Sequence, residues 1–227
     1  GIIAAATEKS VGKLLVQGLY KMEYRGYDSA GVALHQIDDI AHLRSLGKVK
    51  KLESKMVKEK PKGKIGIAHT RWATHGKPSE KNAHPHVSNN RVFIVHNGII
   101  ENYVALKEQL IKKGYQFNSQ TDSELIAHQL DFFLNQGSEM LEAMSLLKEK
   151  LEGAYAVAAI DLKNESHFYL MRNKSPLLLG QSDSGMFAAS DPLALADLTN
   201  EFIFLEDGDV AEVSAKEYKI LDKNQKR

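Results

Sequence analysis

The order in which strand-like and helix-like segments follow one another is the feature that most constrains this fold. Apolar runs rich in Ile and Val predict strands in the first half of the chain, and apolar residues at helical spacing then predict three helices in succession. From Ala154 onward the pattern is almost wholly that of short strands, interrupted by one short helix at 192–199. Because strands and helices are grouped rather than alternating, we expect an α+β fold with helices layered on antiparallel sheets. The expected strands of the first half are 29–36, 63–74 and 91–100, and the expected helices are 10–26, 101–114, 121–137 and 138–153.

Local signals sharpen some of these boundaries. Ser10 is placed to cap the first helix, and Gly26 follows its end. Thr121 and Glu124 have the spacing of a capping box at the start of a later helix. The lysine-rich segment 48–64 is interleaved with glutamates, so we interpret it as a solvated connector rather than a binding patch.

Composition excludes several classes of protein. The 227 residues carry a formal net charge of +1, which gives no long-range attraction to nucleic acid or to an anionic membrane. No apolar run approaches the roughly 18 residues of a membrane span, and residues 1–10 lack the basic start of a secretory signal. The absence of cysteine excludes disulfides and thiolate metal sites and favours a cytoplasmic location. Without a G-x-G-x-x-G or P-loop motif, no dinucleotide or triphosphate cofactor is expected.

The segment 69–102 concentrates the residues that carry chemistry. It contains the one tryptophan and five of the nine histidines of the chain. Asn97 and Gly98 directly follow the apolar run 92–95, where a side-chain N–H and a backbone N–H could together hold a developing oxyanion. Taken alone, the same Asn-Gly pair is more commonly a turn that ends a strand. Both interpretations stay open at this point.

Two oppositely charged residues suggest a site for an amino acid. Arg71 suits a carboxylate, which it can grip with two parallel hydrogen bonds, and Thr74 and His75 follow on the same loop. Asp122 could bind an ammonium group. Alternatively, Arg71 pairs with a structural acid and Trp72 belongs to the core. Asp122 then only interacts favourably with the positive end of a helix dipole.

The histidines also raise the question of a metal. His69, His75, His84, His86 and His96 lie close in sequence, but only His84 and His86 are tightly spaced and no H-E-x-x-H motif occurs. No metal site is therefore expected. In the segment 24–31, Asp28 and Ser29 are interpreted as buried, hydrogen-bonded residues, because a serine nucleophile would need a G-x-S-x-G elbow that the chain lacks.

Taken together, these segments resemble the glutaminase domain of the glucosamine-6-phosphate synthase family, within the class II amidotransferases. The resemblance runs from Gly1 to about Val213 and rests on motifs that occur in the family's order and spacing: "YRGYDSAG", "LGKV", "HTRWATHG", "NAHPHV", "HNGIIEN", "TDSE", "EGAYA", "SPLLLG", "ASD" and "LEDGDVAEV". It implies an N-terminal-nucleophile hydrolase fold, an αββα sandwich of two antiparallel sheets between helix layers. It also implies one glutaminase domain over residues 1–227, with the family's sugar-phosphate isomerase domains absent from this chain.

The resemblance assigns roles to individual residues. Asn97 and Gly98 match the oxyanion hole, and Arg25 matches a residue that orders the nucleophile. Arg71 matches the residue that binds the α-carboxylate of glutamine, and Asp122 the one that binds its α-ammonium. The other substrate-binding residues implied are Trp72, Thr74 and His75 on a closing loop, Gly98 in the pocket wall, and His84 nearby.

The family's reaction is hydrolysis of the side-chain amide of L-glutamine to glutamate and ammonia, which needs no cofactor. A cysteine at the start of the family's chains forms the thioester intermediate, and its α-amino group acts as base. Gly1 matches the second family residue, so we expect a cysteine immediately before it. The alternative is a glutamine-binding regulatory module that lacks the nucleophile. The expected partners are L-glutamine and the isomerase domain of the full-length enzyme, which is expected to be a homodimer in amino-sugar biosynthesis.

Overall fold

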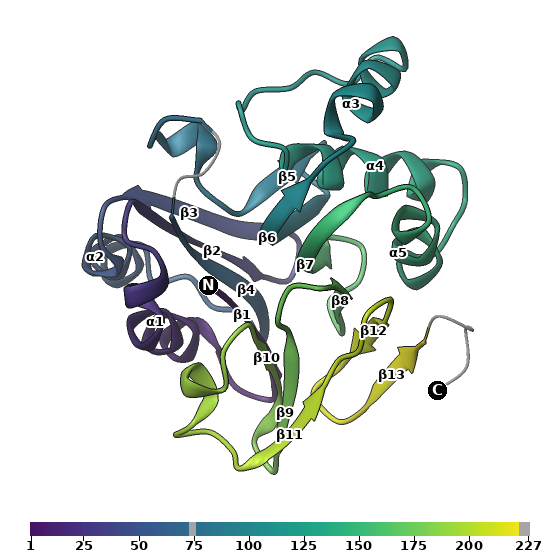
Figure 1. Ribbon diagram of the computed structural model, residues 1–227. Helices are drawn as coiled ribbons and strands as arrows, with labels where there is room; N and C mark the ends of the chain where they lie inside the picture. The colour runs from purple at the N-terminus through teal and green to yellow at the C-terminus, as the bar shows by residue number, and fades with distance from the viewer. Residues whose placement is uncertain (73–75, 223–227) are drawn as a thin grey trace.

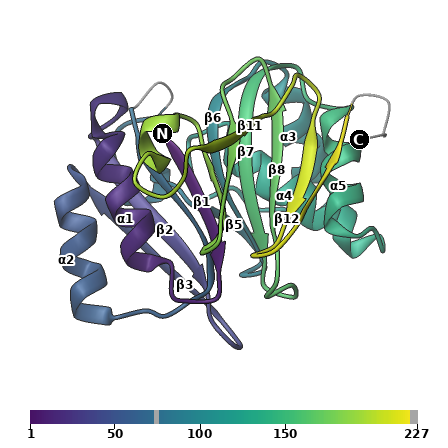
Figure 2. The same cartoon turned by 90° about the horizontal axis from the view of Figure 1, so that it is seen from below.

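The computed structural model describes residues 1–72 and 76–222, which form four layers. Two antiparallel sheets stack face to face, with two helices covering one outer face and three covering the other (Figures 1 and 2). Within the described residues no helix is long and apolar enough to cross a membrane. Two stacked antiparallel sheets between two helix layers form an αββα sandwich, so the expected fold class is confirmed.

The first sheet has seven strands and is built around β1 (Ile2–Thr7) and β4 (Ile65–Arg71), which pair with each other. Its neighbouring strands run antiparallel throughout. In order across the sheet they are β11 (Glu201–Phe204), β9 (Leu178–Ser182), β10 (Gly185–Ala189), β1, β4, β2 (Ser29–His35) and β3 (Ile40–Leu46).

The second sheet has six strands, with β6 (Val92–Ile100) and β7 (Gly153–Asp161) as its longest pair. Its neighbouring strands are also antiparallel. The order is β13 (Tyr218–Leu221), β12 (Val210–Val213), β8 (Phe168–Asn173), β7, β6 and β5 (His86–Ser88).

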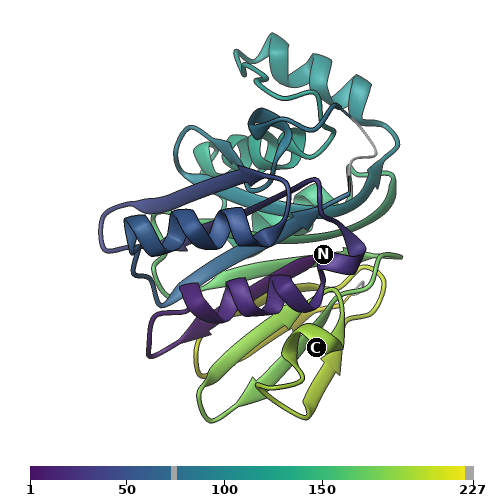
Figure 3. The same ribbon diagram turned by 90° about the vertical axis from the view of Figure 1, so that its left-hand side faces the viewer.

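The helices form the two outer layers. On the first sheet lie α1 (Gly12–Lys21) and α2 (Val49–Glu59), which Figure 3 shows side by side. On the second sheet lie α3 (Tyr103–Lys112), α4 (Glu124–Asn135) and α5 (Met140–Lys148). Short 3-10 turns occur at Glu23–Arg25, Glu80–Asn82 and Pro192–Leu195.

Strand periodicity divides the interior into three cores. Because successive side chains of a strand point to opposite faces, Ile2 and Ala4 of β1 enter the core between the sheets, whereas Ile3 and Ala5 face α1 and α2. The same alternation in β7 sends Ala158 between the sheets and its neighbours toward α3, α4 and α5. Strands that are buried on both faces therefore fix the spacing of all four layers.

Several local expectations are wrong. The segment 48–64 is not a plain connector, because residues Val49–Glu59 form α2. Ser10 does not cap α1, which begins at Gly12 without a side-chain cap; the Ser10 hydroxyl instead accepts a hydrogen bond from Gly63 N. The capping box at Thr121 is also absent. Glu124 instead accepts hydrogen bonds from residues 118 and 119, which precede the helix.

An ion pair ties the β5–β6 turn to the end of β7 and carries a stability prediction. Arg91 donates two hydrogen bonds to the carboxylate of Asp161, at 3.0 and 3.1 Å, and the Asp161 side chain is only 6% exposed. Replacing Arg91 by Ala leaves this carboxylate buried without its cation, so we expect a loss of about 2–3 kcal/mol in the free energy of unfolding. Denaturant titration measures it. The exposed Lys163→Ala serves as the control, with a change within about 0.5 kcal/mol, and an equal effect of the two variants would contradict the prediction.

Candidate functional site

The residues singled out from the sequence converge on one cavity of about 280 Å³ between the two sheets. It opens where β1 begins, β4 ends and β6 approaches its end, so each sheet supplies one wall. The segment just before α4 closes a third side. The lining residues are Gly1, Arg25, His69, Thr70, Arg71, Trp72, His84, His96, Asn97, Gly98, Ile99, Thr121, Asp122 and Ser123.

Asn97 and Gly98 lie inside β6, which continues to Ile100, so the interpretation of this pair as a chain-reversing turn is wrong. Gly98 pairs with Tyr155 of β7 and has a φ of +122°. A Cβ atom at this position would lie 2.0 Å from the carbonyl oxygen of Ala154. Only glycine fits this close approach, which fixes the backbone next to Asn97.

The side chain of Asn97 is oriented by a histidine. His69 Nε2 lies 2.9 Å from Asn97 Oδ1, and because this oxygen only accepts, His69 donates. The amide nitrogen Nδ2 is then the group of Asn97 that can donate to a ligand in the cavity. Nδ2 donates no hydrogen bond to any of the described residues.

Arg71 ends β4 and is 5% exposed. Its NH1 lies 3.5 Å from Asp28 Oδ1, and its NH2 donates to the carbonyl oxygen of Gly76 at 3.2 Å. Ser29 in turn donates to the same Asp28 oxygen at 2.9 Å. Arg71 therefore both pairs with a structural acid and lies in the cavity wall, and Asp28 holds its guanidinium in place.

Asp122 faces the cavity from the segment before α4 and is 6% exposed. Its Oδ2 accepts from the backbone nitrogen of Ile100 at 2.8 Å, which ties the α4 segment to the end of β6. Its Oδ1 lies 3.5 Å from the hydroxyl of Ser123. One carboxylate oxygen thus fixes the side chain, and the other has only this long contact.

Four of the five histidines form a buried cluster, and three of them, His69, His84 and His96, line the cavity. The rings of His69 and His84 are 4.1 Å apart, and those of His84 and His86 are 4.6 Å apart. Burial lowers the pKa of His69 and His84 well below the usual range and that of His86 to about 3, so these rings are neutral at pH 7. Within residues 1–72 and 76–222 no group of three or more His, Cys, Asp or Glu side chains is arranged to hold a metal ion.

Trp72 and Arg25 also line the cavity. Trp72 is 59% exposed and packs edge-on against Tyr27 with ring centroids 5.5 Å apart, so its assignment to the core is wrong. Arg25 pairs with Asp191 at 3.0 Å. Thr74 and His75 lie outside the described residues.

Sequence reasoning missed the part played by Ser123. Its hydroxyl lies 2.9 Å from His96 Nδ1 and 3.5 Å from His84 Nε2, so it joins the α4 segment to the histidine cluster. The motif "TDSE" contains this serine, but nothing local indicates that residues 27 and 39 positions away would be its partners.

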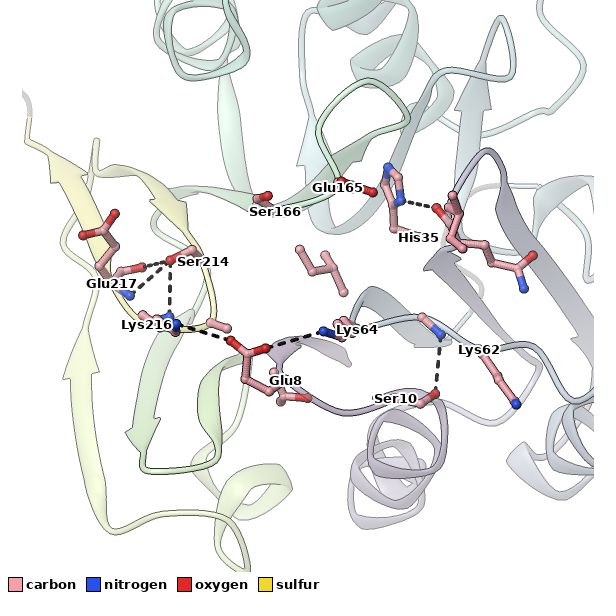
Figure 4. Close-up of a pocket in the computed structure, with 16 residues that line it drawn as sticks. Glu8, Ser10, His35, Lys62, Lys64, Glu165, Ser166, Ser214, Lys216 and Glu217 are labelled. Carbon is pink, nitrogen blue, oxygen red and sulfur yellow. Dashed lines mark hydrogen bonds and ion pairs between the residues drawn. The ribbon is translucent and has the colours of Figure 1, made fainter.

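A larger cavity, of about 850 Å³, lies at the opposite end of the sheets and contains none of the expected site residues (Figure 4). Glu8 stands between Lys64 and Lys216, with N–O distances of 3.5 and 3.7 Å. These side chains are largely exposed, so their ion pairs add little to stability. The chemistry expected from the sequence gathers at the smaller cavity.

The arrangement described above is that of a class II glutamine amidotransferase domain. Residues 69–197 match the family described as "Glutamine amidotransferase domain", and the chain belongs to this family. It is 46% identical over 223 residues to the glutamine–fructose-6-phosphate aminotransferase (isomerizing) of Vibrio parahaemolyticus and 46% identical over 226 residues to that of Yersinia pestis. The matches cover 98% of this chain but only 36% and 37% of the two relatives.

Solved structures show the same fold at lower identity. The glutamine phosphoribosylpyrophosphate amidotransferase of B. subtilis aligns with a TM-score of 0.83 and 22% identity, over 96% of this chain and 48% of that one. A glutamine aminotransferase class-II domain protein from Silicibacter pomeroyi aligns with a TM-score of 0.65 and 15% identity, over 97% of this chain and 98% of that one.

The expected cysteine mechanism is wrong for this chain. Its 227 residues contain no cysteine, so no side chain here can form the thioester intermediate. Gly1 lines the cavity, and its nitrogen donates to the carbonyl oxygen of Thr70 at 2.7 Å. The chain therefore belongs to the family, but it cannot hydrolyse glutamine with a cysteine of its own.

Proposed function

We propose that this chain is a glutamine-binding module without a cysteine nucleophile. In this proposal Arg71 binds the α-carboxylate of L-glutamine and Asp122 its α-ammonium group. Asn97 Nδ2 and the backbone N–H of Gly98 point toward the oxygen of the side-chain amide. In the absence of a nucleophile these donors stabilise the bound amide itself rather than a tetrahedral intermediate.

One observation carries the proposal: Arg71 and Asp122, of opposite charge, line the same cavity as the amide of Asn97. An α-amino acid carries a carboxylate and an ammonium group on one carbon, so it needs two charged partners of opposite sign close together. Both partners are nearly buried, which strengthens their charge-assisted hydrogen bonds relative to an exposed site.

The remaining residues receive supporting roles in the same proposal. Trp72, with Thr74 and His75, covers bound glutamine, and His84 supports the wall behind it. Arg25, held by Asp191, orders the start of β1 beside the cavity. These roles agree with the position of the described members in or next to the cavity lining.

The setting of the module follows from its relatives. The chain spans only 36–37% of the length of the relatives it matches, which are named as isomerising aminotransferases of fructose 6-phosphate. We infer a single glutaminase-type domain over residues 1–227 that works beside a sugar-phosphate isomerase partner in a cytoplasmic homodimer. It senses or holds glutamine for amino-sugar synthesis.

Calorimetric titration with L-glutamine tests the proposal. Arg71→Ala is expected to weaken glutamine binding roughly 30- to 150-fold, because it removes charged hydrogen bonds worth about 2–3 kcal/mol. Arg71→Lys keeps a cation beside Asp28 but not the two-pronged geometry, so a smaller loss is expected. Ammonia release from glutamine is expected to stay at the background rate throughout.

Two results would contradict the proposal in different ways. A folded Arg71→Ala variant with unchanged glutamine affinity, judged by circular dichroism, would show that the carboxylate assignment is wrong. Failure of the unsubstituted chain to bind millimolar L-glutamine would reject the glutamine-binding function itself.

A further inference from the structure

The two charged residues of the proposed glutamine site come from different parts of the fold. Arg71 ends β4 of the seven-stranded sheet, whereas Asp122 lies in the segment before α4. The bond from Ile100 N fixes Asp122 relative to β6 of the six-stranded sheet and does not reach toward β4. An α-amino acid needs the two charges at a fixed separation, because its carboxylate and ammonium group sit on one carbon. This separation depends on what connects the β4 side to the segment before α4.

A buried asparagine makes such a connection. Asn82 is 2% exposed and ends the short turn Glu80–Asn82 between β4 and β5. Its Nδ2 donates to the carbonyl oxygen of Lys77 at 2.9 Å, and its Oδ1 accepts from the backbone nitrogen of Gln120 at 2.9 Å. Nδ2 also donates to the side-chain oxygen of Gln120 at 3.2 Å. One side chain thus bridges the segment that follows β4 and the segment that carries Asp122.

The amide of Asn82 fits in one orientation only. If Nδ2 and Oδ1 were exchanged, an oxygen would face the carbonyl oxygen of Lys77, and an N–H₂ group would face the N–H of Gln120. Both contacts would then be repulsive. A side chain with only a donor or only an acceptor cannot make both bonds, so a primary amide suits this position.

The connection continues from Asn82 to Arg71. Arg71 NH2 donates to the carbonyl oxygen of Gly76 at 3.2 Å, and Gly76 directly precedes Lys77. Gly76 also packs against the amide, because a Cβ atom there would lie 2.7 Å from Asn82 Nδ2. Two consecutive backbone carbonyls are therefore held, the first by Arg71 and the second by Asn82.

On the other side of the connection, Asp122 lies two residues after Gln120 in the same segment. Other hydrogen bonds tie that segment to β5 and β6 of the six-stranded sheet, so loss of the Asn82 side chain would not detach it. The loss would remove the bonds between this segment and the residues that Arg71 holds. Asp122 would then be free to shift relative to Arg71, and a site that grips both ends of a ligand tolerates a displacement of only about 0.5 Å.

We propose that Asn82 is a positioning residue that sets the separation between Arg71 and Asp122, and that it thereby selects ligands with a carboxylate and an ammonium group on one carbon. The inference rests on the proposed function, since it takes glutamine to be the ligand between these two charges. Asn82 is not part of the cavity lining and acts through the backbone at Lys77 and Gln120.

The backbone amide signal of Ile100 in NMR spectra of the ligand-free chain tests the placement of Asp122, because Ile100 N donates to its Oδ2 at 2.8 Å. Asn82→Ala is expected to shift this signal, and the control Asn164→Ala is not. The amide of Asn164 also bonds to a hydroxyl group and to a backbone nitrogen, but in the β7–β8 turn, outside the cavity lining. An unchanged Ile100 signal in a folded Asn82→Ala variant would overturn the proposal, whether or not glutamine binds.

A double-mutant cycle, measured by NMR titration with L-glutamine, separates positioning from a general structural effect. Asn82→Ala is expected to weaken glutamine binding about tenfold in the otherwise unchanged chain, and less than about twofold in a chain that already carries Asp122→Asn. Without the carboxylate of Asp122, the separation of the two charges no longer matters. Equal losses of affinity in both backgrounds would show that Asn82 does not act through Asp122.

Asn82→Asp keeps the size of the side chain and decides the question if Asn82→Ala does not fold. It retains an acceptor for Gln120 N but turns an oxygen toward the carbonyl oxygen of Lys77, so it too is expected to weaken glutamine binding. Unchanged affinity in Asn82→Asp would overturn the proposal. If the unsubstituted chain binds no glutamine but Asn82→Ala still shifts the Ile100 signal, the proposed function fails while the placement of Asp122 by Asn82 holds.

Discussion

Lowering the pH from about 7 to about 5 is expected to reduce the free energy of unfolding by several kcal/mol. The cause is the buried histidine cluster, in which His69, His84 and His86 are 2–4% exposed. Burial lowers the pKa of all three, and it also lowers the pKa of His96 in the same cluster. His42, whose ring packs edge-on against Phe93, has its pKa lowered to about 4 by burial and by Arg44.

The sign follows from which state binds more protons. In the unfolded chain each imidazole takes up a proton below about pH 6.5, whereas in the folded chain it stays neutral until its lowered pKa is reached. Between these two values acid therefore favours the unfolded state. At about pH 5 each such ring contributes up to about 2 kcal/mol of destabilisation, and total stability is only about 5–15 kcal/mol.

Urea denaturation at a series of pH values measures this effect. The free energy of unfolding is expected to decline already below about pH 6.5. Glu124 acts in a separate window: burial alone would raise its pKa, but the neighbouring His128 ring and the hydrogen bonds from residues 118 and 119 lower it to about 2. Its stabilising contribution is lost only as the pH falls below about 4 toward that value. His86→Gln is expected to reduce the slope between about pH 6.5 and 5 by up to one proton. A flat stability profile across that range would contradict the neutral state of the cluster.

The packing of helices on antiparallel sheets could be predicted from the sequence, because helix-like and strand-like segments stand in separate blocks. The stacking of two sheets between helix layers was implied only by the family resemblance. Elements whose sequence lacks a clear hydrophobic period could not be predicted. The strand β1 reads "IIAAAT" and is buried on both faces, so it shows no alternation of apolar and polar residues. The helix α2 buries only Val49 and Leu52 among many lysines, so it resembles a solvated connector.

The candidate site was predicted as a set of residues but not as a geometry. The types of Arg71, Asp122 and Asn97 indicate the chemistry, because few other side chains could grip an amino acid and its amide. Their positions depend on contacts that no local pattern specifies, such as the hydrogen bond from Ile100 N to Asp122. Whether Asn97 lies in a turn or in a strand likewise depends on the pairing of β6 with β7, which is a tertiary property.

Gly98→Ala is expected to destabilise the protein by about 3–5 kcal/mol and to abolish glutamine binding. The φ of +122° is unfavourable for alanine, and the new Cβ would lie 2.0 Å from the carbonyl oxygen of Ala154, a backbone atom of the paired strand. The strand pair must separate locally to relieve this contact. Because Asn97 precedes Gly98 in the same strand, the separation also displaces the amide that the proposed function requires.

Gly114→Ala is the matched control for this prediction, since Gly114 also has a positive φ, of +92°, but a Cβ there would meet nothing within 4 Å. Its expected cost is the backbone strain alone, about 1–2 kcal/mol, with glutamine affinity unchanged. Denaturant titration and calorimetry on the two variants therefore separate conformational strain from the close approach of β6 and β7. Equal losses of stability in the two variants would show that the approach at Ala154 adds nothing, and glutamine binding that survives in Gly98→Ala would show that the site does not depend on it.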